Sequence, residues 1–111
     1  MNGNFVFKNA VIRFEEVINE ALNYSNLTSK DISLLIPHQA NLRISQYIQS
    51  RLKLSNSQVF NNIMKYGNTT AASIPIALKE ALDNGKLKKG DILCLAAFGS
   101  GFTWASALIR W

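Results

Sequence analysis

The sequence has few of the residues from which disulfides and metal sites are made. Its 111 residues contain one cysteine, Cys94, and one histidine, His38. A single cysteine excludes a disulfide within the chain and a zinc site built from several thiolates. Because only one histidine could join it, we expect no metal ion to be bound by the chain.

Long apolar runs are also absent. No run reaches the roughly 20 residues that a membrane-spanning helix needs, and the N-terminal region is amphipathic where a signal peptide would have an apolar core. These absences predict a cytoplasmic protein that does not bind membranes. The composition, 48% hydrophobic and 17% charged, is typical of globular proteins, and no boundary is visible, so residues 1–111 are expected to form one domain.

Acidic residues are missing from one stretch of the chain. The net charge is +5, and residues 41–65 contain four basic residues and no acidic one. This local excess of positive charge favours an acidic partner, although a solvated helix face would have the same composition. Nucleic acid is a weaker candidate, because aromatic residues do not alternate with the basic ones as stacking platforms would.

Hydrophobic periodicity predicts an α/β protein. Helices are expected at 5–22, 41–52 and 71–82, and strands at 33–36, 58–60, 91–98 and 102–111. This α-β-α-β-α-β-β order predicts one mixed sheet, with the last two strands antiparallel because so few residues join them. The first half of helix 71–82 has almost no charge, so we expect this helix to be buried nearly all round.

Three polar or glycine-rich loops follow expected strands, and ligand sites in open α/β sheets form beyond strand ends. They contain His38, Asn68 and Gly99. A helix starting beside His38 favours a neutral imidazole, whose N–H could donate to an oxygen that gains charge, as could the Asn68 amide. Glycine lets backbone N–H groups approach a substrate closely. Such a set of donors without a base suits an enolate or an oxyanion.

Each of these residues also has an ordinary structural role. A histidine at a strand end is more often a capping or core residue, and Asn68 after Gly67 is typical of a turn. A Gly-x-Gly sequence between strands is typical of a hairpin bend. Cys94 stands between two leucines in an expected strand, so an inert buried thiol is the favoured interpretation.

Three strings, in this order and spacing, resemble a known family. They are PHQAN-x-R-I, GNT-x-AAS-x-P and AFG-x-GFTW-x-SAL-x-R-W, and they resemble the C-terminal half of β-ketoacyl-acyl-carrier-protein synthase III. The resemblance covers essentially all 111 residues. It implies a thiolase-like half-domain, with a mixed sheet and one buried helix, from an acyltransferase that starts fatty-acid synthesis.

The resemblance implies a role for several residues. In this family an acyl group passes from coenzyme A to a cysteine, malonyl-acyl carrier protein loses CO₂, and the enolate attacks the acyl-cysteine. His38 and Asn68 resemble the histidine and asparagine that stabilise the enolate. Phe98 and Gly99 would lie near the oxyanion hole. Met1 and Gly3, with Asn68, would lie along the pantetheine tunnel.

The resemblance also implies partners. Arg43, Arg51 and Lys53 would face the acidic acyl carrier protein, and the coenzyme A thioester would be a substrate, with no separate cofactor. Full-length relatives are expected to be homodimers. The single histidine favours the type III branch and its polyketide-forming relatives, because elongating synthases use two.

The chain departs from the family in one respect. The nucleophilic cysteine of the family belongs to the N-terminal half, and Cys94 does not match its position. We therefore expect the chain to need a cysteine-bearing half for condensation, and to expose an apolar patch and self-associate without it. The alternative is a non-catalytic half-domain that binds carrier protein.

Overall fold

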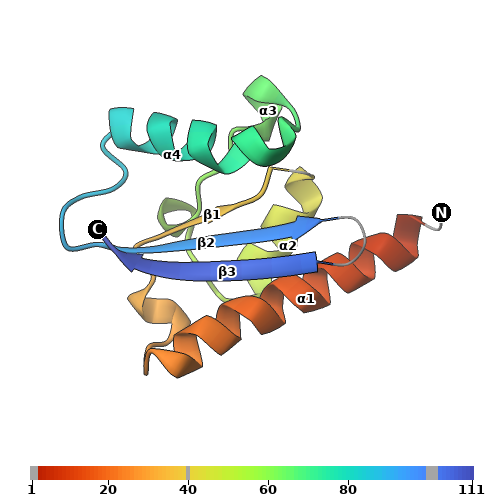
Figure 1. The fold of residues 1–111 in the computed structure, drawn as a ribbon, viewed down its shortest axis with the longest axis horizontal. Helices are drawn as coiled ribbons and strands as arrows, with labels where there is room; N and C mark the ends of the chain where they lie inside the picture. The colour runs from red at the N-terminus through yellow and green to blue at the C-terminus, as the bar shows by residue number, and fades with distance from the viewer. Residues whose placement is uncertain (1–2, 40, 100–102) are drawn as a thin grey trace.

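The computed structural model describes residues 3–39, 41–99 and 103–111 (Figure 1). Its helices are α1 (Gly3–Tyr24), α2 (Leu42–Arg51), α3 (Ile63–Tyr66) and α4 (Ser73–Asp83), and its strands are β1 (Leu34–Pro37), β2 (Ile92–Gly99) and β3 (Thr103–Arg110). Short 3₁₀ turns are η1 (Ser29–Asp31), η2 (Asn56–Gln58) and η3 (Thr70–Ala72). No helix in the described ranges is both long and apolar enough to cross a membrane.

The strands form one mixed sheet in the order β1-β2-β3. β1 is parallel to β2, and β3 is antiparallel to β2, which confirms the expected antiparallel pair at the end of the chain. The prediction of a strand at 58–60 is wrong, because Val59 alone forms an isolated bridge, to Leu35. The turn η2 ends just before Val59, and the Asn62 N–H is bonded to the side chain of Gln39, so the chain leaves the sheet on both sides of the bridge.

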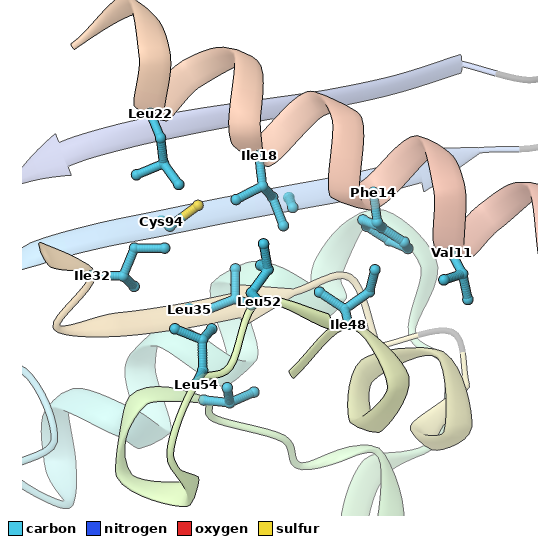
Figure 2. Close-up of a cluster of buried hydrophobic side chains, with 12 residues drawn as sticks. Val11, Phe14, Ile18, Leu22, Ile32, Leu35, Ile48, Leu52, Leu54 and Cys94 are labelled. Carbon is cyan, nitrogen blue, oxygen red and sulfur yellow. The ribbon is translucent and has the colours of Figure 1, made fainter. Parts of the chain in front are cut away.

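Helices cover both faces of the sheet (Figure 1). Side chains alternate along each strand, so successive residues of β1 point to opposite faces. Leu35 and Cys94 lie in the cluster that α1 and α2 form with the sheet, whereas Leu34, Ile36 and Leu93 lie in the cluster under α4. Figure 2 shows the first cluster, with the buried side chains of α1 facing the sheet across Cys94 and Leu35.

Helix α1 is held against the last strand of the chain. The Ser106 hydroxyl donates to the Val17 carbonyl at 2.6 Å. The Arg13 guanidinium lies 4.9 Å from the centre of the Trp104 ring. The amphipathic pattern predicted for 5–22 is therefore confirmed, and it faces β2 and β3.

Helix 71–82, expected to be buried nearly all round with part of that cover from the cysteine-bearing half, is buried on one face in this chain. Along α4 only Ser73, Ala77 and Ala81 are buried, while Pro75 is exposed. The helix packs on the sheet with one face, and no described residue covers the opposite one. Nearby on α3, Met64 is 68% exposed. Apolar residues thus reach the surface here, and the expected self-association stays a prediction.

Candidate active site

The ends of two strands bring His38 and Gly99 to one edge of the sheet. β1 and β2 are parallel, so their carboxyl ends lie on the same side (Figure 1). The His38 N–H donates to the Ala96 carbonyl at 2.7 Å, which continues the ladder one residue beyond Pro37. By strand alternation, the His38 side chain follows Leu34 and Ile36 on the α4 face of the sheet.

The His38 ring is anchored through one of its nitrogens. Nδ1 lies 2.6 Å from the hydroxyl oxygen of Ser73, the first residue of α4. The ring is half-buried, and this burial lowers the pKa of His38, so the imidazole is neutral at pH 7. Within the described ranges Nε2 has no hydrogen-bond partner. With its proton on Nε2, the ring could donate to a substrate at this end of the strand.

Gln39 holds two parts of the site together and was not predicted from the sequence. Its buried side-chain amide donates to the Pro37 carbonyl at 2.6 Å. Its Oε1 accepts from the backbone N–H groups of Asn62 and Ile63, at 2.9 and 3.1 Å. The start of α3 is thus fixed to the end of β1. The only signal in the sequence was a polar residue beside His38.

Asn68 lies in the turn between α3 and η3, and its amide orientation is set locally. Gly67 ends α3 with φ 70°, a conformation that favours glycine. The Asn68 Oδ1 accepts from the Thr70 N–H at 2.9 Å, which leaves the side-chain NH₂ group to donate elsewhere. Asn68 is exposed and has no hydrogen bond to His38 among the described residues. Ser73 is the link between His38 and this segment.

Phe98 and Gly99 end β2 but do not touch His38 through any described contact. The Phe98 ring is stacked on Trp104, with centroids 6.3 Å apart, and lies 6.2 Å from the Phe14 ring. It therefore lies on the α1 side of the sheet, opposite to His38. Among the described residues, an added Cβ at Gly99 would have one close neighbour, the Thr103 carbonyl oxygen at 3.7 Å, which is an ordinary van der Waals contact.

The predicted carrier-binding residues differ in their surroundings. The exposed Arg43 guanidinium lies 5.0 Å from the centre of the Phe7 ring. Arg51 is paired with Glu15 at 2.9 Å, so much of its charge is neutralised. Lys53 is exposed, just after α2, and has no ion pair within the described ranges.

The two residues predicted to line a pantetheine tunnel stand at the start of the chain. Met1 lies outside the described residues. Gly3 is the first residue of α1, whose N-terminal end lies on the same side as the carboxyl ends of β1 and β2 (Figure 1).

Cys94 does not reach this site. It lies in the middle of β2, fully buried beneath α1 (Figure 2). Burial raises the pKa of the Cys94 thiol from 9.0 to about 12. No group of three or more histidine, cysteine or acidic residues in the described part of the chain could hold a metal ion.

Native Cys94 is expected to resist alkylation. With a pKa of about 12 instead of 9.0, its thiolate fraction at pH 7.5 is about 1,000-fold lower than that of an exposed thiol. Iodoacetamide should leave the folded chain unmodified and label it fully in denaturant, as read by intact mass. Rapid labelling under native conditions would contradict the buried position of this thiol.

Comparison with known proteins identifies relatives over the whole chain. Residues 22–111 match the family model for 3-oxoacyl-[acyl-carrier-protein (ACP)] synthase III C terminal. The β-ketoacyl-[acyl-carrier-protein] synthases III of Desulfotalea psychrophila and Caldanaerobacter subterraneus are 51% and 52% identical over 111 residues, which is 34% of each relative. The crystal structure of the Aquifex aeolicus synthase III superposes with a TM-score of 0.97 and 48% identity, over 100% of this chain and 36% of that one. The chain therefore spans about a third of the length of these relatives.

Proposed function

The chain belongs to the family of 3-oxoacyl-[acyl-carrier-protein] synthase III C-terminal domains, and from this premise we propose that it supplies the decarboxylating part of a condensing acyltransferase. The observation that supports this best is the state of His38. Burial lowers the pKa of His38, which favours the neutral ring, and the ring is anchored at Nδ1 with no described partner at Nε2. A neutral N–H donor at a strand end suits a group on which negative charge develops.

In the proposed reaction a malonyl thioester loses CO₂. The bond between the carboxylate and the α-carbon breaks, and its electron pair moves toward the thioester oxygen to give an enolate. His38 Nε2–H and the Asn68 NH₂ group would donate hydrogen bonds to that oxygen. The enolate carbon then attacks an acyl thioester, forming the new C–C bond and releasing the thiolate. Gly99 would shape this site from the end of β2, whereas Phe98 lies on the opposite face of the sheet.

The acyl group must be carried by a cysteine outside this chain. Cys94 is excluded from this role by its burial and its pKa of about 12. The proposed complete enzyme therefore needs a cysteine-bearing part, and we include homodimer formation and a cytoplasmic location in the proposal. An acyl-coenzyme A would load that cysteine, and no separate cofactor would take part.

The proposed partner that delivers malonate is an acidic carrier protein. Arg43 and Lys53 are exposed and unpaired within the described part of the chain, so their charges are available to it. Arg51 would first have to leave Glu15. Exposed charges of this kind act mainly on the rate of encounter. A second candidate function is carrier binding without catalysis, which the absence of a reactive thiol among the described residues favours.

The test is to assay the chain alone and as part of a complete enzyme. The complete form is a chimera in which the chain replaces the matched third of the Desulfotalea psychrophila relative. Malonyl-carrier decarboxylation and β-ketoacyl-carrier formation would be followed by mass spectrometry. We expect condensation only by the chimera. Condensation by the chain alone, abolished by Cys94→Ala, would contradict the proposal, and an inactive but folded chimera that binds carrier protein would favour the non-catalytic candidate.

A further inference from the structure

We propose that Ser73 is a positioning residue that holds His38 in the neutral tautomer with its proton on Nε2, by donating its own hydroxyl proton to Nδ1. Ser73 is the serine of the string GNT-x-AAS-x-P, but no role was predicted for it from the sequence. The inference about the tautomer stands on the contacts of two side chains, and its consequence for catalysis rests on the proposed function.

The first step is the set of contacts at the Ser73 hydroxyl. Ser73 is 2% exposed, so water does not reach it freely. Its Oγ lies 2.6 Å from His38 Nδ1 and 3.3 Å from the backbone nitrogen of Gln39. The Gln39 N–H can only donate, so it occupies one lone pair of the hydroxyl oxygen.

The second step concerns the hydroxyl proton. If Nδ1 carried the ring proton, Oγ would accept two hydrogen bonds, from His38 and from Gln39. The Ser73 proton would then be buried without an acceptor among the described residues, which is unfavourable. If Ser73 donates instead, Nδ1 accepts, and every described group is satisfied. The neutral ring must then carry its proton on Nε2.

The third step shows why this serine does not donate to the turn that precedes α4. A serine in a helix often donates to the carbonyl four residues earlier. Here that carbonyl belongs to Thr69, and it already accepts from the Ala72 N–H at 3.1 Å and the Thr70 hydroxyl at 2.8 Å. The Ser73 hydroxyl is therefore directed to His38.

Ser73 and His38 are each held in place by the element that carries them. Ser73 begins α4, which is packed on the sheet through Ala77 and Ala81. His38 is held at the end of β1 by the bond from its N–H to the Ala96 carbonyl.

Without the Ser73 hydroxyl, part of the population would place the ring proton of His38 on Nδ1 and present a lone pair at Nε2. A lone pair would repel the enolate oxygen that the proposed function brings there.

The experiment is ¹⁵N NMR of the full chain labelled at histidine, in which His38 gives the only ring signals. Ring ¹⁵N shifts and couplings to the ring protons distinguish the two tautomers. We expect the wild-type ring to carry its proton on Nε2. In Ser73→Ala we expect the tautomer ratio to fall about fivefold, the effect of one hydrogen bond. Ser73→Thr, which keeps the hydroxyl, should restore the wild-type ratio.

The matched control is Ser45→Ala. Ser45 is also a buried serine, but its hydroxyl donates to the Asn61 side chain and not to His38. This variant should leave the His38 spectrum unchanged. A wild-type ring protonated on Nδ1, a Ser73→Ala ring identical to wild type, or an equal change in Ser45→Ala would each overturn the proposal.

The same variants separate this inference from the proposed function. In the chimera, Ser73→Ala should lower decarboxylation and Ser73→Thr should restore it. If decarboxylation does not depend on His38 at all, the proposed function is wrong, but the NMR result on the tautomer still supports the role of Ser73. If His38 is required but the tautomer is wrong, only the role of Ser73 fails.

Discussion

His38→Ala is expected to lower malonyl-thioester decarboxylation by the chimera by about 10²–10³-fold, the usual cost of removing one donor to a developing oxyanion. The His38 ring lies at the end of β1, with Nδ1 held by Ser73 and no partner for Nε2 among the described residues, and the proposed tautomer places the donor N–H on Nε2. Asn68, the second proposed donor, lies on an exposed turn and cannot replace a donor that is missing from β1. The measurement is the rate of CO₂ release at saturating malonyl-carrier protein.

Two further variants make this result specific. His38→Gln keeps an N–H group near the position of Nε2, so it should retain more activity than His38→Ala. Asn84→Ala, which changes an exposed asparagine at the end of α4, should leave the rate unchanged and so serves as the control for a change outside the site. Full activity of His38→Ala, with unchanged circular dichroism, would mean that another group stabilises the enolate.

Phe14→Ala is expected to destabilise the chain by about 3–5 kcal/mol, the range measured for large-to-small changes in protein cores. Phe14 is 2% exposed and lies in the cluster between α1 and the sheet. Its ring also lies beside Phe98, at 6.2 Å, so its loss would open a cavity under the end of β2. The measurement is the free energy of unfolding in urea, from the midpoint and slope of the transition.

A neighbouring residue on the same helix provides the control. Ile12 is 41% exposed, so Ile12→Ala removes a large aliphatic side chain from α1 without making a comparable cavity. It should cost less than about 1 kcal/mol. Equal losses for the two variants would mean that α1 is not packed on the sheet as the structure shows.

The elements predicted well were those whose signal is local. Apolar spacing located α1 and α2 to within about two residues, the usual uncertainty of helix ends. The two long strands were found because an apolar run is broken by glycine and polar residues. The prediction of a strand at 58–60 was wrong because the path of the chain after Val59 depends on the hydrogen bond between Asn62 and Gln39. No local sequence pattern connects these two residues. The apolar composition of α4 predicted burial on all sides, but composition does not say whether another surface covers the face that points away from the sheet.

The candidate site shows the same division. His38 and Asn68 could be named because one follows a strand and the other a glycine turn, and because their strings resemble a family. Gln39 and Ser73 were missed because their contacts join residues between 23 and 35 positions apart, which no local pattern connects. The pairing of Arg51 with Glu15 joins residues 36 apart, so the sequence overstated the free charge near α2. Local patterns predict which residues face a site, whereas the groups that orient them are found only in three dimensions.

The packing of α1 on β3 has a consequence for biosynthesis. The bond from Ser106 to Val17 joins residues 89 positions apart, and β2, the other strand beneath α1, is also made late. A ribosome synthesises α1 before β2 and β3, so the part of the surface that these two strands supply to α1 forms late. Contacts so distant in sequence close slowly, because a long loop must be ordered before they form. During translation the apolar residues of α1 that pack on β2 and β3 therefore stay exposed until these strands are made, and a chaperone would bind them in that interval.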